Sequence, residues 1–281
     1  MKSCLLLYLV LFLAERVFAD TPSAQTAADY CNSATSDYMN GNFGSAIAEA
    51  TKAIALDPKN IDAYEIRGTA KKFKGDLERS IADYDGAIAD FTKAIELNPN
   101  AAGIYSDRGN TKEAKGDLEG AIADYGKTIE LEPESTYAYA RRGGCKEAKG
   151  DHDGAIADFT KAIELKPKFS VAQDYSSRGN AKNSKGDYDG AIADCDKAIK
   201  LDPTSAIAYS TRGNARNAKG DPDGAIADYD QAIKLNPRGL DAVNAYTNRG
   251  TAKKAKGDLE GAAADLNKAE ELRSQQSSRN H

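Results

Sequence analysis

Residues 206–237 read AIAYSTRGNARNAKGDPDGAIADYDQAIKLNP, and this stretch decides the fold. Apolar residues recur at helical spacing on both sides of Gly220-Asp221, which predicts two amphipathic helices joined by a tight turn. Gly220 tolerates the left-handed conformation that ends a helix, and the Asp221 carboxylate can cap the next one. Pro222 suits a first helical position, and Pro237 stops the second helix. The stretch therefore predicts one helix–turn–helix unit.

The same unit recurs along the chain. Lys-Gly-Asp places glycines at 75, 116, 150, 186, 220 and 257, and Gly41-Asn42 is a degenerate earlier copy. A tyrosine recurs in all seven units, at Tyr30, Tyr64, Tyr105, Tyr139, Tyr175, Tyr209 and Tyr246. A period near 34 residues predicts an array of stacked helical repeats. We divide residues 27–273 into repeats 27–60, 61–101, 102–135, 136–171, 172–205, 206–242 and 243–273.

These units resemble tetratricopeptide repeats (TPRs), which carry an aromatic residue at position 4, Gly at 8, Ala at 20 and Pro at 32. In unit 206–237 these are Tyr209, Gly213, Ala225 and Pro237. The resemblance implies an all-α fold, a right-handed superhelical solenoid of about seven TPR repeats. It also implies a concave groove, lined by the first helix of each repeat, that holds a peptide or a partner segment.

Two rows of charge depart from the TPR pattern. Position 7 is Arg in six units (Arg67, Arg108, Arg142, Arg178, Arg212 and Arg249), and position 11 is basic in the same six. Position 23 is Asp in six units (Asp83, Asp124, Asp158, Asp194, Asp228 and Asp265). Because acids and bases recur in equal number, we predict that the Asp row neutralises the basic rows between packed helices. An anion-binding basic ladder is the alternative.

The second repeat carries seven extra residues between Gly75 and Pro99. Seven residues are close to two helical turns, so the apolar face stays nearly in phase. We therefore expect one second helix that is longer by about 10 Å.

The N-terminus predicts export. Lys2, an apolar run from Cys4 to Ala14, and Val17-Phe18-Ala19 form a signal-peptide pattern over residues 1–19, with cleavage after Ala19. The alternative is a retained membrane anchor. We expect a periplasmic, secreted or secretory-lumen protein with no membrane span after cleavage. Residues 20–26 are expected to be a flexible lead, and residues 274–281 a polar tail.

Composition argues against several functions. With 38 Lys+Arg, 43 Asp+Glu and a net charge of −5, the chain lacks the basic excess of a nucleic-acid binder. Two His and four Cys residues, with no catalytic or metal-binding motif, predict no enzyme, no metal site and no cofactor. Cys31, Cys145 and Cys195 lie on different repeats, so we expect no disulfide among them.

The predicted groove changes character along the array. Its early half is acidic, with Arg141 opposing, which suggests a neutral or basic partner segment. Its late half is rich in carboxamides, and each carboxamide offers donors and an acceptor to a peptide backbone. The candidate site residues are Asn110, Arg141, Ser176, Asn180, Asn183, Ser210, Asn214, Asn217, Thr247 and Asn248. The competing interpretation is that these side chains only solvate an exposed face.

The sequence thus predicts a non-catalytic protein-interaction scaffold with an unidentified protein or peptide partner. An alternative is an accessory subunit of an envelope or secretion assembly, docking through the convex face or the lengthened helix of the second repeat.

Overall fold

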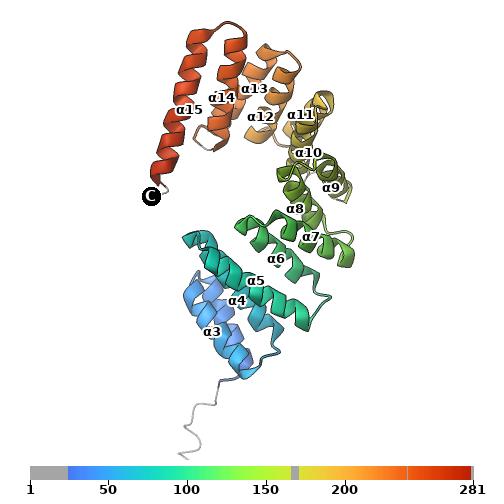
Figure 1. Cartoon of the computed structure of the whole chain (residues 1–281), viewed down its shortest axis with the longest axis vertical. Coiled ribbons are helices and arrows are strands. Elements are labelled where there is room, and N and C mark those ends of the chain that lie inside the picture. The colour runs from blue at the N-terminus through green and yellow to red at the C-terminus, as the bar shows by residue number, and fades with distance from the viewer. Residues whose placement is uncertain (1–24, 166–170, 239, 280–281) are drawn as a thin grey trace, which may run out of the picture. The chain divides into compact units, whose positions relative to one another are not determined.

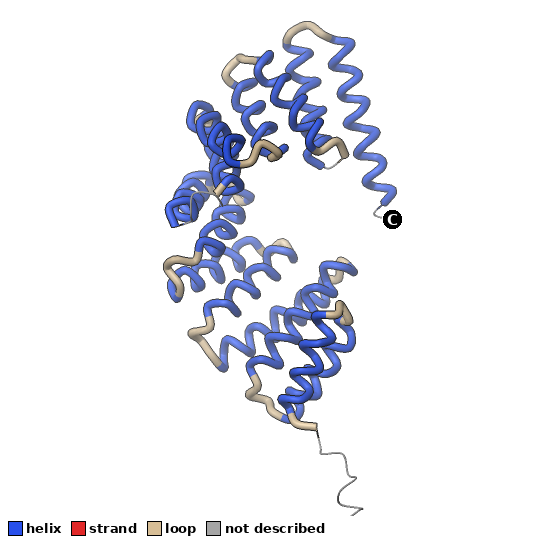
Figure 2. Tube along the Cα trace, turned by 180° about the vertical axis from the view of Figure 1, so that it is seen from behind, coloured by secondary structure: helices blue, strands red, loops and turns tan. Residues whose placement is uncertain are grey.

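The computed structural model describes residues 25–165, 171–238 and 240–279 (Figure 1). The predicted signal peptide and residues 20–24 of the predicted lead lie outside these ranges. The described part contains helices and loops but no strand (Figure 2). The helices are α2 (Ala27–Met39), α3 (Phe43–Leu56), α4 (Ile61–Glu78), α5 (Ile81–Leu97), α6 (Ala102–Lys115), α7 (Leu118–Leu131), α8 (Thr136–Ala148), α9 (His152–Leu165), α10 (Ala172–Lys185), α11 (Tyr188–Leu201), α12 (Ala206–Ala218), α13 (Pro222–Leu235), α14 (Leu240–Ala255) and α15 (Leu259–Arg279).

The helices pack as consecutive pairs, from α2 with α3 to α14 with α15. The chain divides into two compact units, one containing α2 to α5 and ending at Pro99, the other containing α6 to α15 and beginning at Asn100. Within each unit a first helix also contacts the first helix of the neighbouring pair, as α10 does with α12. The predicted all-α solenoid of helix–turn–helix repeats is confirmed.

The turns inside the pairs follow from Gly-Asp. Gly116, Gly150, Gly186, Gly220 and Gly257 have φ between 82° and 92°, a conformation that costs glycine nothing. The following aspartate accepts a hydrogen bond from the backbone N–H three residues on, as Asp221 does from Gly224 at 2.9 Å. This bond satisfies one of the amide groups left free at a helix start. The turn chemistry predicted for residues 206–237 is confirmed.

The glycine at position 8 lets the two helices of a pair approach closely. A Cβ on Gly213 would lie 2.8 Å from Cε1 of Tyr229, and one on Gly109 would lie 3.0 Å from Cε1 of Tyr125. Both tyrosine rings are almost completely buried. In these pairs the core is therefore built from a large ring on the second helix and a bare backbone on the first, with alanines filling the remaining space.

The seven extra residues of the second repeat lengthen both of its helices, so the expectation of one longer second helix is wrong. The first helix, α4, runs through Gly75-Asp76 to Glu78, and the chain turns at Arg79, which has φ 54°. The second helix, α5, starts after Ser80, whose hydroxyl accepts a hydrogen bond from the Asp83 N–H. Gly75 stays helical because the Tyr84 ring covers it, 3.0 Å from where a Cβ would lie.

The predicted neutralisation of the charged rows is confirmed. In five repeats the Arg at position 7 forms an ion pair with the Asp at position 23, at 2.5–2.7 Å. In the second repeat the partner of Arg67 is Asp90 and not Asp83, because the extra residues shift the register of α5. The base at position 11 binds the same carboxylate, for example Lys182 with Asp194 at 2.8 Å.

Four of these arginines, Arg67, Arg178, Arg212 and Arg249, also join one repeat to the preceding one. The second guanidinium arm of Arg178 donates to Thr160 Oγ1 at 3.0 Å, and that of Arg212 lies 2.6 Å from Asp196. Each of these partners belongs to the second helix of the preceding pair. We call this arrangement, one arginine bound to its own Asp and to position 25 of the preceding repeat, the arginine clamp. The Tyr at position 4 lies against the position-7 arginine, with ring-to-guanidinium distances of 5.2–5.7 Å in six repeats.

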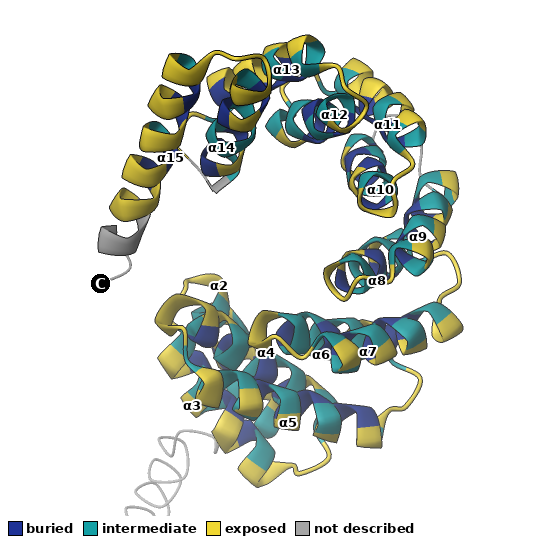
Figure 3. Ribbon diagram, turned by 45° about the horizontal axis from the view of Figure 1, so that its top comes forward, coloured by how far each residue is buried: buried dark blue, intermediate teal, exposed yellow. Residues whose placement is uncertain are grey.

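The last helix ends the stack. Its buried residues, such as Ala269 and Leu272, face α14, and the side that points away from α14 is exposed (Figure 3). Residues 274–279, predicted as part of a polar tail, continue this helix.

Candidate functional site

The first helices α8, α10, α12 and α14 of the second unit contact one another in sequence order and line a groove. Three adjoining pockets of about 250, 300 and 280 Å³ lie along it. Their polar lining consists mainly of carboxamides and hydroxyls. Asn180, Ser210, Asn214 and Asn248 line the first of these pockets, and Asn183, Asn214, Asn217 and Asn248 line the third. Ser176 borders the second pocket, so the structure brings seven predicted site residues together.

Asn214 is the centre of a hydrogen-bond network in this groove. Its Oδ1 accepts from the Tyr229 hydroxyl at 2.8 Å and from Asn248 Nδ2 at 2.9 Å. These two bonds fix the orientation of the Asn214 amide, because its oxygen must face both donors. The Asn214 NH₂ group and the Asn248 oxygen have no partner among the described residues. A donor and an acceptor are thus held beside each other at the groove.

A second network lies where α6 meets α8. Asn110 Oδ1 accepts from Tyr125 at 2.8 Å and from Tyr137 at 2.6 Å. The predicted site residue Arg141 lies 2.7 Å from Glu113. Burial raises the pKa of Tyr125, so this hydroxyl stays protonated and continues to donate. Asn110 and Arg141 are therefore held by neighbours, outside the three pockets described above.

Glu147 on α8 connects the groove to two other helices. Its carboxylate lies 3.4 Å from Asn180 Nδ2 and accepts from the Ser184 hydroxyl at 2.8 Å. His152 Nδ1 lies 2.8 Å from its other oxygen. Both hydrogen-bonded oxygens of Glu147 are thus used to position neighbouring groups.

Three predicted residues are placed less favourably for a ligand. Ser176 is fully buried, and its hydroxyl donates to the Ala172 carbonyl at 3.1 Å, although it borders the 300 Å³ pocket. Thr247 donates to the Val243 carbonyl in its own helix. Asn183 Oδ1 is buried without a hydrogen-bond partner among the described residues.

Several groove residues were not among the predicted site residues, and they include Ile207, Thr211, Asp241 and Asn244. Ile207, Thr211 and Asn244 occupy repeat positions 2 and 6, which the TPR pattern already assigns to the groove. Asp241 precedes the predicted last repeat, 243–273, but α14 already begins at Leu240. Its carboxylate lies in the first turn of that helix, where the helix dipole favours an acid.

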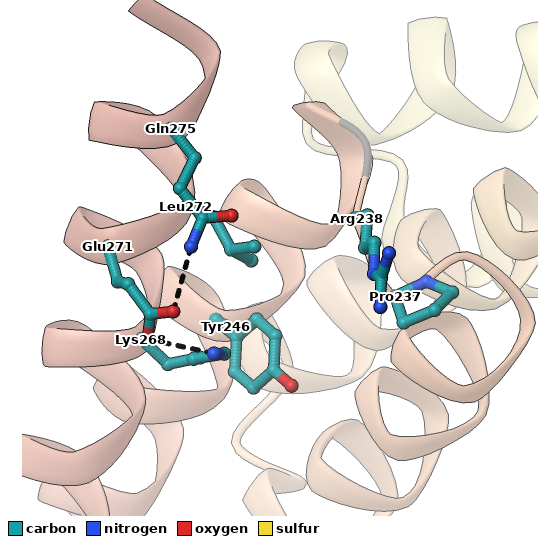
Figure 4. Close-up of a pocket in the computed structure, with 7 residues that line it drawn as sticks. All are labelled: Pro237, Arg238, Tyr246, Lys268, Glu271, Leu272 and Gln275. Atoms are coloured by element: carbon teal, nitrogen blue, oxygen red, sulfur yellow. Dashed lines mark hydrogen bonds and ion pairs between the residues drawn. The ribbon is translucent and has the colours of Figure 1, made fainter. Parts of the chain in front are cut away.

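Another pocket, of about 440 Å³, lies at the end of the stack between α15 and the segment before α14 (Figure 4). Pro237 and Arg238 face Tyr246, Lys268 and Leu272 across it. Lys268 is paired with Glu271 at 2.8 Å. The pocket therefore combines one engaged ion pair with the apolar surfaces of Pro237, Tyr246 and Leu272.

The cysteines do not supply reactive groups. Cys31, Cys145 and Cys195 are free and buried, as the repeat layout predicts. Burial raises the pKa of Cys145 and of Cys195 to about 12. Across residues 25–165, 171–238 and 240–279, no three His, Cys, Asp or Glu side chains are grouped to hold a metal ion. No helix in the same ranges is both long enough and apolar enough to span a bilayer.

Comparisons with known proteins agree with this architecture. Models of the tetratricopeptide repeat match residues 106–168, 206–238 and 243–276, and a further TPR repeat model matches residues 75–116 and 179–220. The chain belongs to the tetratricopeptide repeat family, whose members are protein-interaction scaffolds that bind protein or peptide partners. No curated protein sequence matches it.

Several solved structures are similar. A tetratricopeptide repeat protein from Parabacteroides merdae is 23% identical, with a TM-score of 0.68 over 88% of this chain and 93% of that one. MamA is 28% identical, with a TM-score of 0.51 over 60% of this chain and 96% of its own. YrrB, described as a TPR protein with an unusual peptide-binding site, is 22% identical, with a TM-score of 0.54 over 70% of this chain and 96% of its own.

Proposed function

We propose that this protein is a non-catalytic scaffold that holds an extended segment of a protein partner in the groove formed by α8, α10, α12 and α14. The observation that carries the proposal is the fixed amide of Asn214. Tyr229 and Asn248 orient it, so its NH₂ group and the Asn248 oxygen present a donor and an acceptor to the groove. A peptide group needs this complement, whatever side chain it carries.

Two further observations support the groove. Carboxamides from three successive first helices, Asn180, Asn214 and Asn248, line one continuous pocket, so a segment crossing the helices meets a polar group at each repeat. YrrB, which shares the fold, is described as having a peptide-binding site. The signal-peptide pattern of residues 1–19 supports a location outside the cytoplasm, in the periplasm, the medium or a secretory lumen.

The test is selection from a random dodecapeptide display library with residues 20–281 as the immobilised protein. A variant with Asn180→Ala, Asn214→Ala and Asn248→Ala is selected in parallel. A control variant with Gln231→Ala and Asn267→Ala removes exposed carboxamides from second helices. We expect enriched peptides that bind the parent and the control but lose binding to the groove variant. Circular dichroism confirms that all three proteins are folded. Equal binding to all three would contradict the groove, as would the absence of any enriched peptide.

A second candidate is docking through the lengthened α4–α5 pair of the first unit. Its tip exposes Leu77 and Ile81, at 73% and 63%, and Phe73 lies on the same helix pair at 38%. Exposed apolar side chains of this size at one tip are typical of a contact with another protein. If this docking is the function, Leu77→Ser with Ile81→Ser abolishes capture of the natural partner from an extracytoplasmic extract. The groove variant then leaves that capture unchanged.

A further inference from the structure

The centre of the groove combines one apolar side chain with one free acid. Ile207, Asp241, Asn180 and Thr211 border both the 250 Å³ and the 300 Å³ pocket. Ile207 is 41% exposed there, whereas Ile95, Ile104 and Ile233 are buried. Asp241 stands on the next first helix and borders the same space. These two side chains therefore line one site, to which Ile207 contributes apolar surface and Asp241 a carboxylate.

The described charged side chains that border this site are acidic. Glu147 and Asp241 border the 300 Å³ pocket, and among the described residues no Lys or Arg borders any of the three groove pockets. Glu147 is engaged by Asn180, Ser184 and His152. Asp241 has neither a hydrogen-bond nor an ion-pair partner among the described side chains. The groove therefore attracts a cation to Asp241 and repels a carboxylate, since like charges in a half-enclosed space destabilise a complex.

One type of side chain matches this pair of surfaces. Lys and Arg carry a long aliphatic stem and a charged head, and they bury the stem along apolar surface while the head stays at a polar or charged group. When the aliphatic stem of a ligand Lys or Arg packs on Ile207, its charged group can reach Asp241. The backbone of the same segment can then reach the Asn214 and Asn248 amides on the neighbouring turns.

We propose that the groove selects a peptide segment with a Lys or Arg at one fixed position, whose stem lies on Ile207 and whose charge pairs with Asp241. This inference rests on the proposed peptide-binding function and adds the class of ligand to it. Both side chains act through direct contact with the ligand.

The test starts from the dodecapeptides enriched on residues 20–281. A synthetic copy of one enriched peptide is compared with copies in which its Lys or Arg is replaced by norleucine, which keeps the stem, or by Glu. Each peptide is titrated by fluorescence anisotropy against the parent, Asp241→Asn, Ile207→Ser, and the control Glu260→Gln. Glu260 is exposed in the first turn of α15, so its substitution by Gln removes one acid outside the groove.

We expect enrichment of Lys or Arg at one position. Replacing it by norleucine weakens binding to the parent about fivefold, because a partly exposed ion pair contributes about 1 kcal/mol. The same replacement has no effect on binding to Asp241→Asn. Ile207→Ser weakens the Lys and the norleucine peptides alike. Glu260→Gln binds as the parent does.

Each other outcome is decisive. Enriched peptides without a preferred cation overturn this inference and leave the groove proposal standing. A cation preference that persists in Asp241→Asn overturns the assignment to Asp241. Failure to enrich any peptide overturns the groove proposal and this inference together.

Discussion

Arg178 Nη2 lies 2.7 Å from Asp194 Oδ1, and Arg178 Nε lies 2.7 Å from the other oxygen of the same carboxylate. The pair is bidentate and almost removed from solvent, with 13% of the arginine side chain and 3% of the aspartate side chain exposed. Because the other arm of Arg178 reaches Thr160 on α9, this one side chain connects three helices. Its effect on stability is therefore open to direct measurement.

Arg178→Met should lower the free energy of unfolding by about 3 kcal/mol, because it leaves a buried carboxylate with Lys182 as its remaining charged partner. Urea denaturation followed by circular dichroism measures the change. Lys161→Met is the control, since its pair with Glu164 is long, at 3.6 Å, and about half exposed. The control should unfold as the parent does. If Arg178→Met also unfolds as the parent does, the clamp has no stabilising role.

The same pairs predict sensitivity to acid. Burial alone raises the pKa of Asp194, but hydrogen bonds and charges from Arg178 and Lys182 outweigh it and hold this pKa below its ordinary value. The balance is the same at Asp265, with Arg249 and Lys253. A lowered folded-state pKa contributes stability above the unfolded value, near 3.9, and the contribution is lost as the pH falls through the folded value.

We therefore expect the melting temperature to fall steeply below about pH 4 and to change little on this account between pH 5 and 7. Asp194→Asn should melt at a lower temperature than the parent at pH 7, and the difference should shrink towards pH 3. A constant difference from pH 7 to pH 3 would show that the Asp194 charge is not involved.

Gly213→Ala should destabilise the protein, by about 1–3 kcal/mol, because the added methyl group meets the Tyr229 ring at 2.8 Å. The ring cannot move aside without losing its bond to Asn214. Gly144→Ala is the matched change in α8, where a Cβ meets no atom within 4 Å. It should stabilise by up to about 1 kcal/mol, the difference in helix propensity. Thermal unfolding of both variants tests this contrast, and destabilisation of equal size in both would contradict it.

Cys145 and Cys195 should resist alkylation in the folded protein. Burial raises the pKa of both thiols to about 12, so very little reactive thiolate exists at pH 8. Iodoacetamide labelling followed by mass spectrometry should modify both residues in urea and neither in buffer within minutes. Rapid labelling of folded protein would indicate that the α8–α9 or α10–α11 pair opens readily.

The repeat pattern was enough to predict the helix pairs, their Gly-Asp turns and the pairing of the charged rows, because each depends on residues close in the chain. It was misleading at Gly75-Asp76. The same dipeptide that ends the other first helices lies inside α4, since Tyr84 covers the glycine and Arg79 adopts the left-handed turn instead. That choice depends on packing across the pair, which the dipeptide does not encode.

The sequence predicted which repeat positions line the groove, but not how each side chain is oriented. The repeat frame places Asn180, Asn214 and Asn217 on the first helices, and the structure gathers them. It could not indicate that the Ser176 hydroxyl turns inward to the Ala172 carbonyl, because that depends on the rotamer. Asp241 was missed for a different reason, since the predicted last repeat begins at residue 243, whereas α14 already begins at Leu240.

The arginine clamp has a consequence for how such a chain can change over generations. Arg178, Arg212 and Arg249 each carry both halves of the link, one to their own repeat and one to the preceding one. A DNA segment that encodes one whole repeat can therefore be duplicated or lost, and the two new neighbours still present matching ends. At these three junctions the array can gain or lose one repeat without a compensating substitution. The junction of Arg142 differs, because position 25 of the preceding repeat is Gly126, which has no side chain to bind.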